Sequence, residues 1–83
     1  MQFPVIHLNG TSKAELLKGY TDALNALDAA MVALAAVTVH GRDYYVIGSD
    51  AASIAFEEHN ARRQALQNVH AELEAIAINI SDQ

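Results

Sequence analysis

The stretch from Leu17 to Leu34, LKGYTDALNALDAAMVAL, decides the fold. Its large apolar residues are separated alternately by three and four positions, and they are Leu17, Tyr20, Leu24, Leu27, Met31 and Leu34. In an α-helix with 3.6 residues per turn, this spacing aligns the side chains in one stripe that can pack along another helix. The stretch therefore predicts a long amphipathic helix with a helical partner.

The beginning of this helix is marked by the segment Ser12–Glu15, SKAE, which fits a capping box. The Ser12 hydroxyl can accept a hydrogen bond from the Glu15 amide, while the Glu15 carboxylate can reach back to the Ser12 amide. β-Branched residues from Val37 to Val39, followed by a glycine, indicate where the helix stops. These signals predict a first helix over residues 13–37.

A second helix is predicted over residues 50–79, with Ser49 or Asp50 as its capping residue. Its expected stripe, again mostly at three and four spacing, consists of Phe56, His59, Arg63, Leu66, Val69, Leu73, Ile76 and Ile80. Within residues 76–80 the apolar residues also alternate with a period of two. Helix and strand therefore both fit this segment.

The connector between the helices covers residues 38–49 and contains two glycines, Gly41 and Gly48. Between them lies Tyr44–Ile47, whose aromatic and β-branched residues favour extended backbone. The pattern predicts a short extended piece in the middle of the connector.

Together these elements predict an all-α fold, a two-helix antiparallel hairpin in a single domain over residues 1–83. Residues 2–9 are expected to be extended, because Pro4 and several β-branched residues disfavour helix there. Folding the helices back about a compact connector places Tyr20 near Leu66. The second helix then outruns the first at its C-terminal end, and the extended N-terminal segment is the expected cover for that overhang.

Self-association is expected to supply the buried surface that a chain of this small size lacks. A domain of 83 residues buries a limited share of its surface, and with no cysteine it has no disulfides to support it. Ala29–Val37 is apolar on every side, and a lone hairpin can cover only one of these sides. We predict a dimer or higher homo-oligomer that forms a bundle.

Composition argues against membrane and nucleic-acid partners. The longest uncharged run, Ala29 to Gly41, is shorter than the ~20 apolar residues that cross a bilayer. A formal net charge of -5 opposes phosphate binding, and Arg62-Arg63 is the only adjacent basic pair. The sequence predicts a soluble protein that does not bind DNA or RNA directly.

No pattern in the chain indicates catalysis, a cofactor or a metal. The four histidines lack the Glu-x-x-His or i, i+4 spacing of helical metal sites. Glu57 and Glu58 are adjacent and point about 100° apart, so they cannot flank one substrate bond. His59 is interpreted as a half-buried residue bonded within its helix, and His70 as an exposed partner of Glu74. The chain is predicted not to be an enzyme.

The segment Gly41–Tyr45, GRDYY, is the candidate interaction site. Tyrosine and arginine are enriched at binding hot spots, because each offers a large contact area with a polar tip. The candidate residues are Arg42, Asp43, Tyr44 and Tyr45. A second interpretation stays open, in which the tyrosines close the end of a small core and Arg42 pairs with Asp43.

Four short stretches resemble a group of small proteins encoded by tailed phages and prophages near the DNA-packaging and portal genes. They are the helix-opening IHLNGTS of Ile6–Ser12, GRDYY of Gly41–Tyr45, Glu58-His59, and Glu72–Glu74. The resemblance spans nearly the whole chain. It implies a non-enzymatic accessory of the phage head, located in the virion or the host cytoplasm.

Two hypotheses about function follow. The first is a phage-type structural or assembly protein, a head or portal accessory or a minor virion component, that self-associates and contacts a larger head or portal protein. The alternative is a small regulatory adaptor or inhibitor that binds one soluble partner protein.

Overall fold

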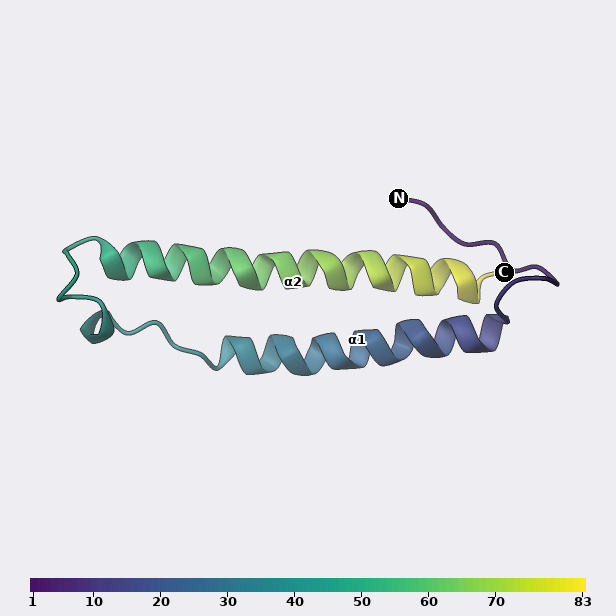
Figure 1. The fold of residues 1–83 in the computed structure, drawn as a ribbon, viewed down its shortest axis with the longest axis horizontal. Coiled ribbons are helices and arrows are strands. Elements are labelled where there is room, and N and C mark those ends of the chain that lie inside the picture. Colours follow the sequence, from purple (N-terminus) through teal and green to yellow (C-terminus); the bar gives the residue numbers. More distant parts are fainter.

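The computed structural model describes all residues 1–83 as two long antiparallel helices with no strand (Figure 1). Helix α1 spans Lys13–Ala35 and helix α2 spans Ala51–Ser81, with the short 3-10 helix η1, Gly41–Asp43, between them. The molecule is elongated, with extents of 61 × 21 × 17 Å. The predicted all-α hairpin is confirmed.

Helix α1 begins where the capping pattern predicts it. Ser12 is its N-cap, and its hydroxyl accepts a hydrogen bond from the Glu15 amide at 3.1 Å. The reciprocal hydrogen bond of the predicted capping box, from the Ser12 amide to the Glu15 carboxylate, does not form. The helix ends at Ala35, two residues before the predicted end, and residues 37–40 continue without helical structure. No residue of the chain has a positive φ, so the helix stops at its β-branched residues and not at a left-handed glycine cap.

The connector differs from the prediction, because its extended piece comes before the tyrosines. His40 has extended backbone, with φ −101° and ψ 132°. From there the chain turns repeatedly: the Tyr45 amide donates to the Gly41 carbonyl at 2.9 Å, and the Ile47 amide donates to the Tyr44 carbonyl at 2.9 Å. The predicted extended piece at Tyr44–Ile47 is therefore wrong, since these local hydrogen bonds hold that segment in turns.

Helix α2 begins at Ala51 and is helical through Ser81, so the segment 76–80 that fits both patterns is helix and not strand. Its N-cap is Asp50, one of the two expected residues. The Asp50 side chain, however, makes no capping hydrogen bond. Helix α2 packs against α1, and the chain offers no sheet that a strand at residues 76–80 could join.

The register between the helices is offset from the predicted one. The Lys13 ammonium donates to the carbonyl oxygens of Gln83 at 2.6 Å and Ser81 at 3.0 Å, so the start of α1 lies beside the end of α2. Tyr20 and Leu73 line a common hollow. The predicted pairing of Tyr20 with Leu66 and the C-terminal overhang of α2 are therefore wrong.

The cause of the offset is the non-helical stretch of residues 37–40, which ends in the extended His40. A residue in extended backbone advances about 3.3 Å and a helical one about 1.5 Å, so residues that leave the helix carry the chain further than the same number of helical residues. The connector therefore runs on past the end of α1 and lies along the first turns of α2 (Figure 1). Val37 and Val39 line a hollow with Phe56 and His59 of α2. The unpaired overhang of α2 is at its N-terminal end.

The seam between the helices matches the predicted stripe in α1 and departs from it at two places in α2. All six apolar stripe residues of α1 are half-buried. In α2 the predicted Phe56 and Val69 are 54% and 43% exposed, while Ala55 and His70 are half-buried in their place. Ile80 is the one fully buried residue of the chain, at the end where both termini meet.

The N-terminal segment is held against the end of α2 by Gln83. Its side-chain amide donates to the Pro4 carbonyl at 2.8 Å, and its side-chain oxygen accepts from the Ile6 amide at 2.8 Å. The chain then turns at His7–Gly10, where a Cβ on Gly10 would lie 2.9 Å from the His7 Nε2. The segment crosses this end of the hairpin without forming a strand (Figure 1).

Replacing Gln83 with alanine is expected to release this segment. Both hydrogen bonds to the segment are lost, together with a third from the Gln83 side-chain amide to Asn79 Oδ1 at 3.1 Å. Each is worth about 1 kcal/mol, so the free energy of unfolding should fall by roughly 1–3 kcal/mol. Hydrogen exchange at the Ile6 amide should become fast. Gln67→Ala, which removes an exposed glutamine with no hydrogen bond to the segment, is the control and should leave that amide protected. Unchanged exchange in Gln83→Ala would contradict the assignment.

Candidate interaction site

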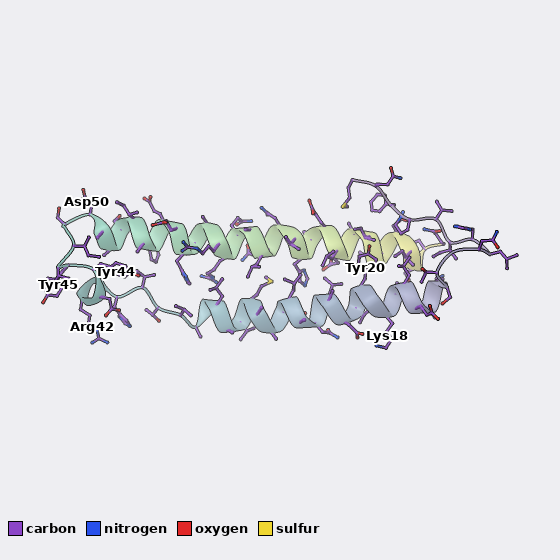
Figure 2. All side chains as sticks on the ribbon, in the orientation of Figure 1. Lys18, Tyr20, Arg42, Tyr44, Tyr45 and Asp50 are labelled. Atoms are coloured by element: carbon purple, nitrogen blue, oxygen red, sulfur yellow. The ribbon has the colours of Figure 1, made fainter.

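The candidate residues lie together at the end of the hairpin opposite the chain termini (Figure 2). Arg42 and Asp43 belong to η1 and are exposed, whereas Tyr44 and Tyr45 follow it in the turn. Tyr44 is half-buried, and Tyr45 is 72% exposed. The two tyrosines thus differ: Tyr44 is placed to close the hairpin end, and Tyr45 is free to contact another molecule.

The local pairing of Arg42 with Asp43 does not form. Neither residue takes part in an ion pair. The Asp43 amide instead donates to the His40 carbonyl at 3.1 Å and closes the first turn of η1. Both charged side chains are therefore directed to solvent, where they can meet a binding partner.

Two apolar residues of this tip were not among the predicted site residues. Val46 is 75% exposed and Ile47 is 74% exposed, next to Tyr45. The sequence predicts extended backbone for these two residues, and residues of a strand are ordinarily half covered by their neighbours. They were therefore not expected to be exposed. Three consecutive exposed apolar side chains, Tyr45, Val46 and Ile47, define what we call the connector tip.

His70 makes the ion pair that joins the two helices. His70 Nε2 lies 2.8 Å from Asp28 Oδ1 on α1, and its Nδ1 lies 3.7 Å from Glu74 Oε2. The prediction of an exposed His70 paired only with Glu74 is therefore wrong, since the histidine is half-buried and bridges the two helices. On α1 the hydrogen bond from Lys18 to Asp22 raises the pKa of the fully exposed Lys18 ammonium.

His59 is half-buried, as predicted, and lines the hollow beside the connector. It makes no hydrogen bond within its helix, which differs from the expectation. No group of three His, Asp or Glu side chains is arranged to hold a metal ion. Neither helix has the length and hydropathy that a membrane span requires.

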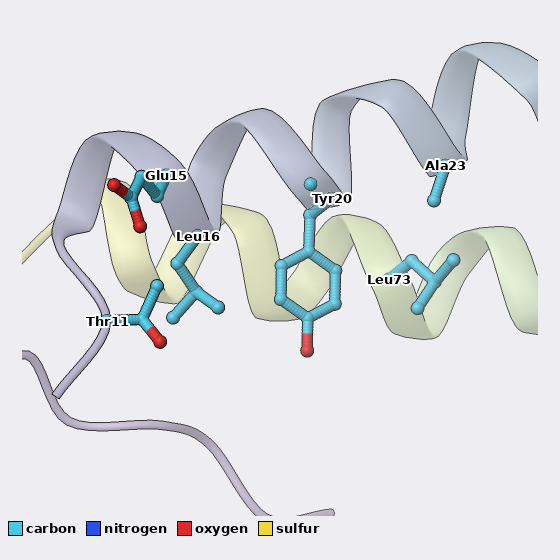
Figure 3. A pocket seen from close by; sticks show the side chains of 7 residues that line it. Thr11, Glu15, Leu16, Tyr20, Ala23 and Leu73 are labelled. Carbon is cyan, nitrogen blue, oxygen red and sulfur yellow. The ribbon is translucent and has the colours of Figure 1, made fainter.

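A shallow hollow of about 330 Å³ opens between the helices near the chain termini (Figure 3). Its lining residues are Thr11, Glu15, Leu16, Gly19, Tyr20, Ala23 and Leu73. A Cβ at Gly19 would project into open space, since no side chain lies within 4 Å of its position. The hollow is lined mainly by apolar groups and carries no cluster of polar groups suited to catalysis.

No protein family model, curated protein or solved structure matches this chain.

Proposed function

We propose that this chain is a non-enzymatic phage-type structural or assembly protein that self-associates and uses its connector tip to contact a larger head or portal protein. The exposed apolar residues of the hairpin support the general part of this proposal, which is a function in protein–protein contact. The phage assignment rests on the resemblance of the GRDYY and IHLNGTS segments. In this role the helices form a rigid rod that presents the tip at one end.

The observation that carries the proposal is the shortage of buried surface. Only Ile80 is fully buried, and large apolar residues such as Val32 and Ile54 are 74% and 54% exposed. The chain exposes 5978 Å². A compact monomer of 8.9 kDa would expose about 4,800 Å². A protein with this much uncovered apolar surface is suited to association with other chains.

The residue types of the connector tip and of Arg42 support a contact with protein. Arg42 is exposed and has no ion pair, and the exposed Tyr45 is followed by the apolar Val46 and Ile47. Aromatic residues and arginine dominate the energetics of protein interfaces. The net charge of -5 disfavours a nucleic-acid partner.

Purification of phage particles that encode this chain is the test. We expect the chain to copurify with particles or with their assembly intermediates, in several copies for each portal ring, because head components assemble with symmetry. Quantitative mass spectrometry of gradient-purified particles and proheads measures this. Absence from both, together with a one-to-one complex with a single soluble protein, would support the adaptor alternative and contradict the proposal.

A further inference from the structure

A hollow of about 210 Å³ lies between the connector and the first turns of α2, and half of the residues that line it are polar. The polar residues are Thr38 of the connector and His59, Asn60 and Arg63 of α2. The three residues of α2 lie within about 100° of one another around the helix, so they share one face. We call this hollow with its lining residues the connector hollow.

The polar side chains of the connector hollow have no partner within the chain. Thr38, His59, Asn60 and Arg63 make neither a side-chain hydrogen bond nor an ion pair. All four side chains can donate hydrogen bonds, and the guanidinium alone carries five N–H groups. The hollow therefore gathers donors that only water or another molecule can satisfy.

Arg63 is the unneutralised charge of this hollow. It is half-buried, and none of the residues three or four positions from it on α2 is acidic. Glu57 and Glu58, the nearest acidic residues on the helix, are turned about 120° and 140° away from it. The neighbouring Arg62, by contrast, lies 3.8 Å from Glu58. In a chain with ten acidic and five basic residues, an arginine without an acidic neighbour marks a place for an acid from outside.

We propose that the connector hollow binds the carboxylate of an aspartate or glutamate side chain of the partner protein. This inference rests on the proposed function and adds a charged contact to the apolar contact of the connector tip. A guanidinium donates two parallel hydrogen bonds to one carboxylate, and such charge-assisted pairs are stronger than neutral hydrogen bonds. The Thr38 hydroxyl and the Asn60 amide are further donors for the same group.

The size and charge of the hollow favour a single carboxylate as its occupant. Pockets for drug-sized ligands measure about 300–1,000 Å³, whereas this hollow measures about 210 Å³. Nucleic acid is bound by many cations along its backbone, but Arg63 is the one lysine or arginine that lines the hollow. One acidic side chain matches one unneutralised arginine.

The position of the hollow fits a contact that continues from the connector tip. Its connector wall, residues 37–39, leads through His40 into η1 and the tip (Figure 1). Two apolar lining residues, Val37 and Phe56, are 55% and 54% exposed. A partner that lies over the hollow covers both while its carboxylate meets Arg63. Removal of water in this way strengthens the charged pair, and arginine is enriched at such interface hot spots.

Binding of a small carboxylate compound to the whole chain tests the site. The probe is N-acetyl-glutamate N-methylamide, and its glutamine counterpart is the neutral control. We expect the NMR signals of the Arg63 guanidinium and the Asn60 side-chain amide to shift in a saturable way with the glutamate compound only. The absence of a saturable shift, or an equal shift with the glutamine compound, would overturn the proposal. Tighter binding of inorganic phosphate would overturn the choice of a carboxylate.

The two adjacent arginines provide a matched pair of variants. Arg63→Gln and Arg62→Gln each remove one positive charge from the same turn of α2, but only Arg63 lines the hollow. We expect Arg63→Gln to weaken binding of the glutamate compound about tenfold or more, and Arg62→Gln to leave it unchanged. Equal losses would mean a non-specific effect of charge and would overturn the site. Circular dichroism checks that both variants are helical.

A variant in the connector keeps the test independent of the folding of α2. Thr38 lies outside both helices, and Thr38→Val removes its hydroxyl while keeping a similar shape. We expect about tenfold weaker binding of the glutamate compound. Normal binding in both Thr38→Val and Arg63→Gln would overturn the proposal. Carboxylate binding by a chain that is absent from phage particles would support the site and contradict only the proposed function.

Discussion

Replacing Leu27 with aspartate is expected to unfold the hairpin. Leu27 is half-buried in the seam, in the middle of α1. An aspartate there loses the apolar contact and moves a carboxylate out of water, which together should cost about 3 kcal/mol or more. A small domain has roughly 5 kcal/mol of stability in total. We expect loss of most helical circular dichroism at room temperature, or a melting temperature lower by more than about 15 °C.

A matched substitution separates this effect from the intrinsic helix propensity of aspartate. Val32→Asp introduces the same residue on the same helix, at a position that is 74% exposed. Leu73→Asp and Ile78→Asp form the corresponding pair in α2, where Ile78 is 54% exposed. Each seam variant should be far less stable than its exposed partner. Equal stability within a pair would mean that the seam is wrongly assigned.

Changing Arg42, Tyr44 and Tyr45 together to alanine is expected to abolish partner capture. Truncating a hot-spot residue commonly costs about 2 kcal/mol, so losing two such residues weakens binding about 1,000-fold. Helix content and self-association should persist, because the connector lies outside the seam. The proposed function makes a phage head or portal protein the partner to test, and its capture by the immobilised chain measures the loss.

The single tyrosine variants divide the two interpretations of the connector. Tyr45 is 72% exposed, so Tyr45→Ala should reduce capture and leave the melting temperature unchanged. Tyr44 is half-buried, so Tyr44→Ala should lower the melting temperature. Normal capture by the triple variant would move the binding surface from the connector to the helix faces. Arg62, Arg63 and the alanine-rich surface would then be the residues to change.

The start and the seam of α1 could be predicted because their signals are local. The Ser12 cap and the alternation of three and four depend only on neighbouring residues, and both are as expected in the structure. The register could not be predicted in the same way. It depends on how far the chain travels before it reverses, and the non-helical residues 37–40 between α1 and η1 move the reversal toward the C-terminus.

The offset register also explains the differences in α2. With the reversal displaced, Ala55 and His70 meet the seam, and Phe56 and Val69 are left exposed. His70 was interpreted as a surface residue because Glu74 is four positions away, but its nearer partner is Asp28 of the other helix. A contact between residues 42 positions apart leaves no periodic signal in either helix. The sequence pattern likewise does not reveal that Val46 and Ile47 are exposed, because their exposure follows from the geometry of the turn.

The meeting of both chain ends beside Ile80 has a consequence for the order of folding. Ile80, the most buried residue, lies at the end of the hairpin farthest from the connector. The hydrogen bonds of Lys13 and those of Gln83 to the N-terminal segment lie at the same end, and they join residues 68 to 79 positions apart in sequence. The entropy lost on closing a loop rises with the logarithm of its length, so these contacts are the most expensive to nucleate. Helix pairing can start near the connector, where packing is loosest, and the tightest part of the molecule closes last.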